Sequence, residues 1–521
     1  MLVVKKYHSQ KYAIVAPRGE TPARDEALKG VFWKHSKHQP GYVFSPSYRR
    51  GTWNGRVNNF SPTDIRAGFL KESLDALDNA NVEWQWEDNK QPEVLPFRTE
   101  TSNEFSYEEF TKFCSDLIEA VNPKFKKKHN IELELRDYQV DAGYKLLREK
   151  IGIALHSTSA GKSIMIAFVL GFLFYKAAIS KAVILVPLQS LVTQFYRDLI
   201  DYGFKESFIG KVFSDSKEIN KPIVVATAAS AKNIIDTLDS EVFFDKTDML
   251  ICDEVHRSSA KTTYKTVTHF KNAKYFFGCT GTLPESELDK DKVFSIFGQI
   301  LDKRNLKELE NEYNAVTKVK VGILNFCYGK MGFLSRLSMN SSTDEWNQEV
   351  EFLQNDDKFR NPYIIGTIKN NFNSGRNVVV LVKNIAYGVR MYNKIKEEID
   401  CNNEQCVFWI DGTMKLRDVD AIIEKCKQDN FNYVIVTDFQ KFSTGINIKT
   451  ISAVFLIDAG QSDVTVAQTI GRGVRKNVGK EDVLVFDCSC DLKYGSRHGR
   501  KRKKLYEREG FFVMEKNIEV Y

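Results

Sequence analysis

The sequence has little of what marks a membrane or secreted protein. No apolar stretch approaches the roughly 20 residues that span a bilayer, and the N-terminus lacks the apolar core of a signal peptide. The nine cysteines form no CxxC pair, and the close pairs, Cys401 with Cys406 and Cys488 with Cys490, lack histidines at the spacing of a zinc site. We therefore expect a soluble, cytoplasmic protein with reduced, buried thiols and no structural metal.

The chain also lacks a large excess of either charge. It carries 75 Lys and Arg against 68 Asp and Glu, a formal net charge of +7, and 27% of its residues are charged. An excess this small cannot make the whole surface basic, so any surface for nucleic acid must come from local clusters. With 42% hydrophobic residues the chain can bury large cores, and 521 residues are too many for one core.

What the sequence does contain is an alternation of short apolar runs and helical segments that starts near residue 131 and recurs to the end. Near-continuous apolar runs predict strands of parallel sheets that are covered by helices on both faces. The first series is Ile151–Leu155, Ala182–Val186, Ile223–Ala226, Met249–Cys252 and Tyr275–Phe277, and the second is Val378–Val382, Val407–Ile410, Tyr433–Val436, Val454–Ile457 and Val483–Phe486. The two series predict two α/β domains, at 131–310 and 311–521.

The first part of the chain has a different texture. Residues 1–98 are rich in aromatic and turn residues, and the apolar spacing over 66–79 predicts an amphipathic helix. We expect a small α+β domain here. Residues 99–130 are expected to form a connector with a helix over 107–121, followed by a basic stretch at 124–129.

A phosphate-binding loop follows the run Ile151–Leu155. Such a loop needs main-chain N–H groups at a helix N-terminus, a lysine for the β- and γ-phosphates and a hydroxyl group for Mg²⁺. Gly161, Lys162 and Ser163 supply these groups, and His156 stands where the opening glycine of the usual pattern would be. We expect ATP to contact Ser157, Thr158, Ser159, Ala160, Gly161, Lys162 and Ser163.

The sequence DEVH, Asp253 to His256, follows another apolar run, Met249–Cys252. A carboxylate at the end of a central strand can hold Mg²⁺, so Asp253 and Ser163 are the expected metal ligands. Glu254 is placed to orient or activate the attacking water. These residues predict ATP and Mg²⁺ as cofactors, with Lys162, Asp253 and Glu254 catalytic.

Over residues 130 to about 490 these and further motifs occur in an order that resembles superfamily-2 helicases of the DExH type. The resemblance implies two tandem RecA-like domains. It also implies a catalytic role for His256 and adenine contacts from Arg136 and Gln139. Further contacts with the nucleotide are implied for Gly445, Asn447 and Gln468, and Asn447 stands where an aspartate is common. The positions implied to contact the nucleic-acid backbone are Gln189, Thr227, Lys383, Ser443 and Thr444.

Two arginines complete the expected catalytic set. Arg472 and Arg475 are three residues apart on a predicted helix, so both point to one side. Two guanidinium groups delivered from a second domain can stabilise the γ-phosphate only when the cleft closes. ATP would then favour the closed state, and hydrolysis would release it.

Near the C-terminus, 497–504 is densely cationic and predicts a helix. Clustered like charges are destabilising unless they meet phosphate, so Arg500 and Lys501 are expected to contact nucleic acid, although a solvated basic face is the alternative.

Within the superfamily, the sequence resembles the phage branch-migration helicases of the UvsW type. The likeness rests on WNGRV at 53–57, GFL at 68–70, the phosphate loop, the late motifs and the basic tail. It implies an ATP-dependent DNA helicase or translocase that acts on forks and four-way junctions, with 3′→5′ polarity, as a monomer in the host cytoplasm if it is phage-encoded. Trp53 and Arg56 are then candidates for contact with duplex DNA, but a core tryptophan is an equal alternative for Trp53. An RNA helicase, a restriction-system motor and a non-catalytic annealing protein stay open.

Overall fold

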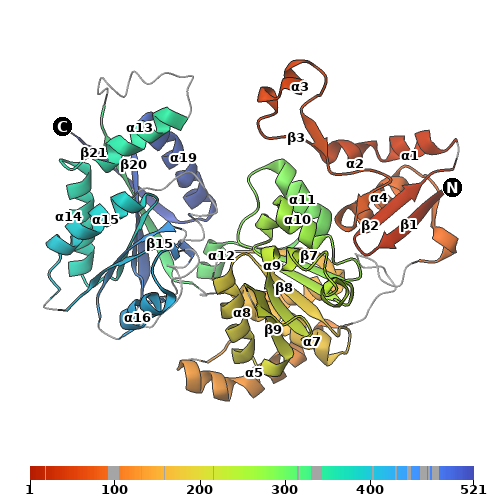
Figure 1. Ribbon diagram of the computed structural model, residues 1–521, viewed down its shortest axis with the longest axis horizontal. Helices are drawn as coiled ribbons and strands as arrows, with labels where there is room; N and C mark the ends of the chain where they lie inside the picture. Colours follow the sequence, from red (N-terminus) through yellow and green to blue (C-terminus); the bar gives the residue numbers. More distant parts are fainter. Residues whose placement is uncertain are drawn as a thin grey trace. The chain divides into compact units, whose positions relative to one another are not determined.

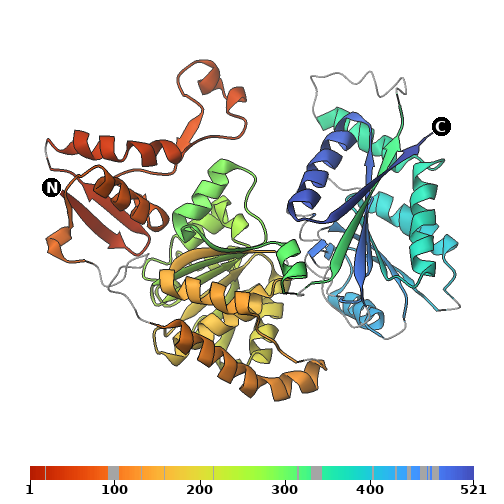
Figure 2. The same ribbon diagram turned by 180° about the vertical axis from the view of Figure 1, so that it is seen from behind.

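The computed structural model describes two compact units, Met1–His156 with Gly161–Lys303 (unit 1) and Ser157–Ala160 with Arg304–Tyr521 (unit 2). Figures 1 and 2 show the chain from two opposite sides. The described residues are all except Arg18, 92–104, 131, 158, 215, 314–315, 330–342, 402–403, 429–430, 440, 443–447, 458–465, 467–469, 472–479 and 521.

Unit 1 contains an eight-stranded sheet in the order β10-β9-β11-β8-β12-β13-β7-β14. The strands from β9 through β7 pair in parallel. Its strands are β7 (Ile151–His156), β8 (Ala182–Val186), β9 (Ile209–Phe213), β10 (Ser216–Lys217), β11 (Ile223–Thr227), β12 (Met249–Asp253), β13 (Tyr275–Thr280) and β14 (Ile300–Arg304). Its helices are α5 (Tyr107–His129), α6 (Asp137–Glu149), α7 (Lys162–Tyr175), α8 (Gln189–Asp201), α9 (Ala228–Lys232), α10 (Lys261–Val267) and α11 (Glu287–Phe297). The five strands predicted in this region are confirmed.

Strand β12 shows why its apolar run is continuous. Leu250 and Cys252 belong to one hydrophobic cluster, whereas Met249 and Ile251 belong to another on the opposite face. Alternating side chains point to opposite faces, so a strand covered on both faces must be apolar at every position. The helix predicted over 107–121 is longer than expected, because α5 continues through Pro123 to His129 and includes the basic stretch.

The N-terminal module, Met1–Asn89, has a four-stranded sheet in the order β5-β2-β1-β6 and a separate antiparallel pair, β3 with β4. The helix predicted over 66–79 is confirmed as α4. The module's elements are β1 (Leu2–His8), β2 (Lys11–Val15), α1 (Thr21–Ala27), α2 (Lys29–Lys34), β3 (Ser36–His38), α3 (Pro46–Arg49), β4 (Arg56–Asn58), β5 (Ile65–Arg66), α4 (Ala67–Asn79) and β6 (Trp84–Trp86).

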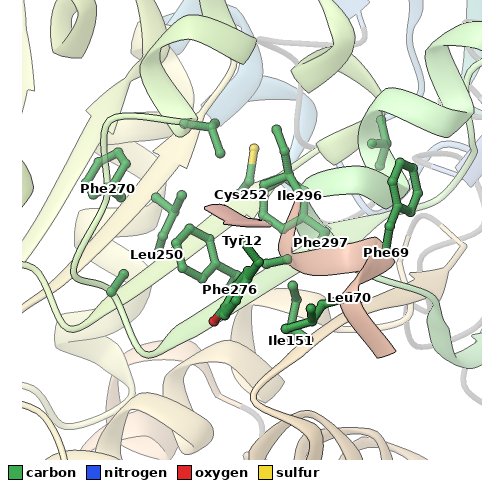
Figure 3. Close-up of a cluster of buried hydrophobic side chains, with 14 of the residues drawn as sticks. Tyr12, Phe69, Leu70, Ile151, Leu250, Cys252, Phe270, Phe276, Ile296 and Phe297 are labelled. Carbon is green, nitrogen blue, oxygen red and sulfur yellow. The ribbon is translucent and has the colours of Figure 1, made fainter. Parts of the chain in front are cut away.

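The module shares one hydrophobic core with the eight-stranded sheet. Tyr12, Phe69 and Leu70 of the module belong to the same buried cluster as Ile151 and Phe297 (Figure 3). Helix α11 lies between them, because it packs against α4 and β3 of the module and against β7 and β13 of the sheet. The module is therefore an integral part of unit 1.

Gly68 allows the closest approach in this shared core. A Cβ atom at Gly68 would lie 1.9 Å from the carbonyl oxygen of Phe294 and 2.9 Å from that of Ser295, and backbone atoms of a packed helix cannot move aside cheaply. Gly68→Ala is expected to lower the free energy of unfolding of unit 1 by about 1–3 kcal/mol. Gly30→Ala in α2 is the matched control, since its Cβ would meet nothing within 4 Å. Thermal unfolding checks both variants, and equal melting temperatures would contradict this account.

Unit 2 contains a seven-stranded sheet in the order β17-β18-β16-β19-β20-β15-β21. Its neighbouring strands all pair in parallel. The five strands predicted here are confirmed, and β15 and β21 were not predicted. The elements are α12 (Leu306–Asn311), β15 (Lys318–Cys327), α13 (Thr343–Gln354), α14 (Arg360–Asn373), β16 (Val378–Val382), α15 (Ile385–Glu398), β17 (Val407–Ile410), α16 (Leu416–Cys426), β18 (Val434–Asp438), β19 (Ala453–Leu456), β20 (Asp482–Cys490), α19 (Lys493–Arg508) and β21 (Phe512–Glu519).

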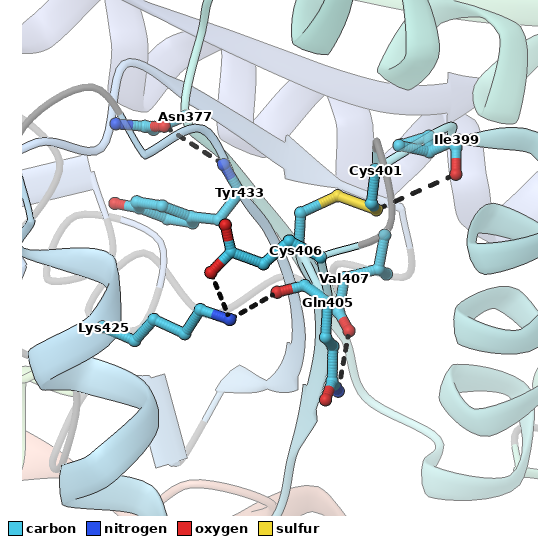
Figure 4. Close-up of a disulfide and its surroundings, with 9 residues drawn as sticks. Asn377, Ile399, Cys401, Gln405, Cys406, Val407, Lys425 and Tyr433 are labelled. Carbon is cyan, nitrogen blue, oxygen red and sulfur yellow. Dashed lines mark hydrogen bonds and ion pairs between the residues drawn. A yellow bond between two sulfur atoms is a disulfide. The ribbon is translucent and has the colours of Figure 1, made fainter.

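The prediction that all cysteines are reduced is wrong for one pair. Cys401 and Cys406, which lie between α15 and β17, form a disulfide with their Cα atoms 5.7 Å apart (Figure 4). Lys425 of α16 contacts the residues just before Cys406, because its ammonium group donates to the carbonyl oxygen of Gln405 and pairs with Glu404 at 3.0 Å. The other seven cysteines are free, and six of them are buried.

Among the helices that the structure describes, none combines the length and the apolarity needed to cross a membrane.

Candidate functional site: a phosphate loop and an acidic strand end

Three adjacent strands of unit 1 bring the predicted catalytic residues to one edge of the sheet. The order β12-β13-β7 places the end of β12 at Asp253, the end of β13 at Thr280, and the end of β7 just before the phosphate loop. Because the strands are parallel, their carboxyl ends share one edge, which is where open α/β sheets bind ligands. The motifs that the sequence spreads over more than 100 residues therefore meet.

The phosphate loop is anchored at its start by polar contacts with the buried carboxylate of Asp302. His156 Nε2 lies 2.8 Å from Asp302 Oδ2, and the other oxygen of Asp302 accepts from Lys145 Nζ at 2.6 Å. Lys162 Nζ donates to the main-chain oxygen of His156 at 3.2 Å. His156 thus does more than occupy the place of the usual glycine, because it fixes the strand end that faces the catalytic lysine.

Gly161 forms the turn into helix α7. It has a left-handed φ of +74°, and a Cβ atom there would lie 2.3 Å from Gln139 Nε2. That amide donates to the main-chain oxygen of Gly161 at 3.3 Å, and Gln139 Oε1 accepts from the main-chain N–H of Arg136 at 2.9 Å. The predicted adenine-contacting residues therefore lie beside the loop. Ser163, the second residue of α7, follows Lys162 at the helix N-terminus, which favours bound anions.

Asp253 and Glu254 have environments that shift their pKa values in opposite directions. Burial and the charge of Glu254 raise the pKa of Asp253, and Asp253 Oδ1 has no hydrogen-bond partner among the described residues. Although burial opposes it, the hydrogen bond from His256 and the charge of Lys162 lower the pKa of Glu254. A buried carboxylate with an unsatisfied oxygen fits a divalent cation, so the donor set of Asp253 and Ser163 is suited to Mg²⁺.

Glu254 is held in a left-handed conformation, with φ of +53°, at the end of β12. The hydroxyl group of Thr280 lies 3.2 Å from Glu254 Oε2 and 2.9 Å from His256 Nδ1, and His256 Nδ1 lies 3.3 Å from the same Glu254 oxygen. A non-glycine residue keeps such a backbone only where its surroundings determine it, and these cases cluster at functional sites. The network joins the DEVH sequence to Thr280 and leaves Glu254 ionised, as a group that orients water must be.

Several predicted residues lie outside the described residues, and their roles stay predictions. These are Thr158, Ser443, Thr444, Gly445, Asn447, Gln468, Arg472 and Arg475.

The predicted nucleic-acid contacts at the strand ends differ in their exposure. Gln189 is exposed at the first turn of α8, and Lys383 is exposed after β16 with its ammonium group 4.2 Å from the ring of Trp346. Thr227 is buried, and its hydroxyl group accepts from the main-chain N–H of Ser230 as the cap of α9. A contact at Thr227 would therefore involve the backbone around it rather than a free hydroxyl group.

Trp53 and Arg56 serve mainly to shape the segment that runs from β3 through β4, which we call the arm (Ser36–Asn58). Trp53 Nε1 donates to the main-chain oxygen of Arg56 at 2.9 Å, and Arg56 Nη1 donates to that of Ser36 at 2.7 Å. The arm instead exposes Phe44, at 72%, with the guanidinium group of Arg49 beside its ring at 6.0 Å. Sequence reasoning missed these two residues, although an aromatic residue close to cations was the available signal.

The predicted basic helix is confirmed as α19, but its cations do not all face outward. Arg500 is exposed and Lys501 is half-buried, whereas Arg502 is 2% exposed. Arg502 makes two hydrogen bonds with Asp487 of β20, at 2.7 and 2.8 Å, and Tyr506 donates to the same carboxylate at 2.6 Å. One cation of the cluster thus anchors the helix, and the others remain candidates for phosphate contact.

Comparisons with known proteins agree with this geometry. Residues 132–285 match the family described as "Type III restriction enzyme, res subunit", and residues 361–477 match "Helicase conserved C-terminal domain". The chain is 24% identical over 502 residues to the ATP-dependent DNA helicase uvsW of Enterobacteria phage T4, covering 92% of this chain and 93% of that protein. It is 29% identical over 240 residues to the DNA 3′-5′ translocase XPB2 of Sulfurisphaera tokodaii, covering 45% and 50% of the two chains.

A solved structure shows the same fold. Dbp5 of S. cerevisiae, bound to RNA and ADP BeF3, is similar with a TM-score of 0.51 at 14% identity, over 80% of this chain and 95% of that one. The prediction of tandem RecA-like domains with parallel sheets is confirmed.

Proposed function

We propose that this chain, a superfamily-2 helicase by its motifs and its relatives, is an ATP-driven motor that remodels branched DNA. One observation carries the proposal. The similarity to the T4 helicase covers 92% of the chain, so it extends into the N-terminal module, which lies outside both matched families. A likeness confined to the motor would support only a generic helicase. The proposed division is a module at 1–98, a connector at 99–130, and motor domains at 131–310 and 311–521.

The residues of unit 1 would carry the ATPase reaction. Lys162 would bind the β- and γ-phosphates, and Asp253 with Ser163 would hold Mg²⁺, which neutralises charge on those phosphates when it is bound. Glu254, ionised and fixed beside Thr280, would orient the attacking water. Arg472 and Arg475 would stabilise the negative charge that develops on the γ-phosphate during hydrolysis.

The arm of the N-terminal module is the proposed contact with the branch. It exposes Phe44 and carries Arg49 beside it, a combination that suits stacking on an unpaired base and pairing with phosphate. Trp53 and Arg56 would support this contact by fixing the arm. Gln189 and Lys383 in the motor and Arg500 and Lys501 in α19 would bind the backbone without reading its sequence.

Replacing the tip of the arm tests its role. Phe44→Ala combined with Arg49→Ala is expected to weaken binding of a fork about tenfold, since loss of one stacked base costs roughly 1–3 kcal/mol. Binding of a single strand should change far less, because the motor's backbone contacts remain. Phe208→Ala, which removes another exposed phenylalanine of unit 1, is the control. Fluorescence anisotropy at fixed salt measures both substrates, and equal loss on the two would contradict a role in branch recognition.

The substrate is tested by the steady-state ATPase rate with no nucleic acid, single-stranded DNA, linear duplex, a fork, a four-way junction and RNA. Ionic strength must be held constant, since phosphate contacts make every affinity salt-dependent. The proposal expects the largest stimulation from the fork and the junction. Stimulation by RNA alone would favour the RNA-helicase alternative, because superfamily-2 motors that act on RNA share the ATP-binding motifs. Equal stimulation by every strand would remove the preference for branches.

A further inference from the structure

Helix α11 connects the N-terminal module to the ATPase elements. On one side it packs against α4 and β3 of the module, and on the other against β7, β13 and the turn Val255–Ser259 that directly follows Glu254. Gly68 brings the backbone of α4 against that of α11 at Phe294. Any change in how the module sits on α11 therefore acts on a helix that contacts two strands of the catalytic sheet and the segment that directly follows Glu254.

A buried histidine makes the polar contact across this junction. His35, 4% exposed, follows α2 and stacks on Phe69 with ring centroids 3.8 Å apart. Its Nδ1 lies 2.5 Å from Asp291 Oδ1 of α11, and its Nε2 lies 3.2 Å from Glu72 Oε2 of α4. Asn59 donates to the second oxygen of Asp291 at 2.9 Å. Both ring nitrogens thus face carboxylates, one from the module and one from the motor.

The charges around the ring favour its protonated form. Asp291 and Glu72 are the carboxylates that face it, and Phe60 and Phe69 cover it with apolar surface. Lys34 pairs with the other oxygen of Glu72 at 2.5 Å, so Glu72 already has a cation of its own. Asp291, 5% exposed, depends on His35 for its charge partner among the contacts described at this junction. A buried carboxylate that loses its partner is strongly destabilising.

We propose that His35 is a positioning residue that fixes the N-terminal module on α11, so that engagement of a branch by the module changes the ATPase elements on the other side of that helix. This inference rests on the proposed function for its DNA-dependent part. The contact of His35 with Asp291 and Glu72 does not depend on the proposed function, because it exists within unit 1 without DNA.

The contact has a pH dependence of known sign. Although burial opposes it, the hydrogen bonds to Asp291 and Glu72 raise the pKa of His35 above its ordinary value near 6.5, and Glu72 has its pKa lowered to about 2. A group with a raised pKa in the folded state stabilises fully below its unfolded value and loses that contribution as the pH rises through the folded value. The contact should therefore be intact at pH 6.5 and weaken toward pH 9, while Glu72 stays ionised throughout.

The first experiment of the test uses no DNA. Hydrogen exchange of the α4 and α11 amides, corrected for the intrinsic pH dependence of exchange, is measured in the full chain at pH 6.5 and pH 9. We expect protection to fall at pH 9 in the wild type, and to be low at both pH values in His35→Gln. His269→Gln, which alters a half-buried histidine of the same unit outside this junction, should behave as the wild type. Unchanged protection in His35→Gln would overturn the proposal.

The second experiment measures the coupling between the module and the ATPase elements as the ratio of the fork-stimulated to the single-strand-stimulated ATPase rate. His35→Gln and Asp291→Asn are each expected to lower this ratio about fivefold or more, the lower end of typical coupling between sites. The double variant should lose no more than either single one, because both remove the same contact. A purely structural role would instead lower both rates together and leave the ratio and its pH profile unchanged, which would overturn the proposal.

The two experiments distinguish a failure of this inference from a failure of the proposed function. If the wild type shows no preference for forks, the proposed function fails, and the hydrogen-exchange result still decides whether His35 fixes the module. If the fork preference is present and His35→Gln keeps it at both pH values, the coupling fails while the proposed function stands.

Discussion

Glu254→Gln is expected to lower kcat for ATP hydrolysis by at least about a hundredfold, the loss typical of removing a general base. The side chain keeps its size and its hydrogen-bond acceptor beside Thr280, but it can no longer attract a proton from water. Binding of ATP should persist, because Lys162 and the loop are unchanged. Single-turnover hydrolysis and binding of a fluorescent ATP analogue measure the two effects separately.

The control for this variant is Glu241→Gln, an exposed glutamate of the same unit whose contact is a surface pair with Lys246. It should hydrolyse ATP at the wild-type rate. If Glu254→Gln retained more than a tenth of the wild-type kcat, Glu254 could not be the residue that activates water. If it also lost ATP binding, the substitution would have disturbed the loop, and the network with His256 would then be structural.

Asp487→Ala is expected to lower the free energy of unfolding of unit 2 by about 3–5 kcal/mol, the cost of leaving one member of a buried ion pair without its partner. Asp487 is 0% exposed and accepts hydrogen bonds from Arg502 and Tyr506, so its removal leaves a buried guanidinium group uncompensated. Hydrogen exchange of the β20 amides at increasing urea concentrations measures this change in the free energy of unfolding of unit 2.

Glu515→Ala provides the comparison, because its pair with Lys503 is exposed and should contribute no more than about 1 kcal/mol. A loss below 1 kcal/mol in Asp487→Ala would mean that Arg502 finds other partners or water, and that α19 is not anchored through this pair. The basic helix could then move freely against its sheet, and its exposed cations would lack a fixed place from which to meet phosphate.

The ATP site could be predicted from the sequence because each of its parts is local. A phosphate loop is one strand, one turn and one helix start, and Asp253 directly follows the apolar run that forms β12. The arrangement of those parts follows from the parallel sheet, which brings all the strand ends to one edge. The order of the motifs therefore predicts both the fold of the motor and the catalytic residues within it.

The junction between the module and the motor could not be predicted in this way. His35 and Asp291 are 256 residues apart, and nothing near either residue marks it as a partner. The same holds for Arg502, which looks like its cationic neighbours until the helix turns it toward Asp487. For Trp53 the sequence left a DNA contact and a core position open, and the structure shows that its indole N–H fixes the arm. Sequence patterns report the secondary structure that a segment prefers. The roles of these residues depend instead on which segments the fold brings together.

The most direct test of the account is the conversion of a four-way junction into its product duplexes, followed on a native gel at fixed salt. The junction should have heterologous ends that prevent spontaneous migration. The account predicts conversion by the wild type with ATP and Mg²⁺, none without ATP, and none by Glu254→Gln. A junction left intact by an enzyme that hydrolyses ATP and separates tailed RNA duplexes would contradict it.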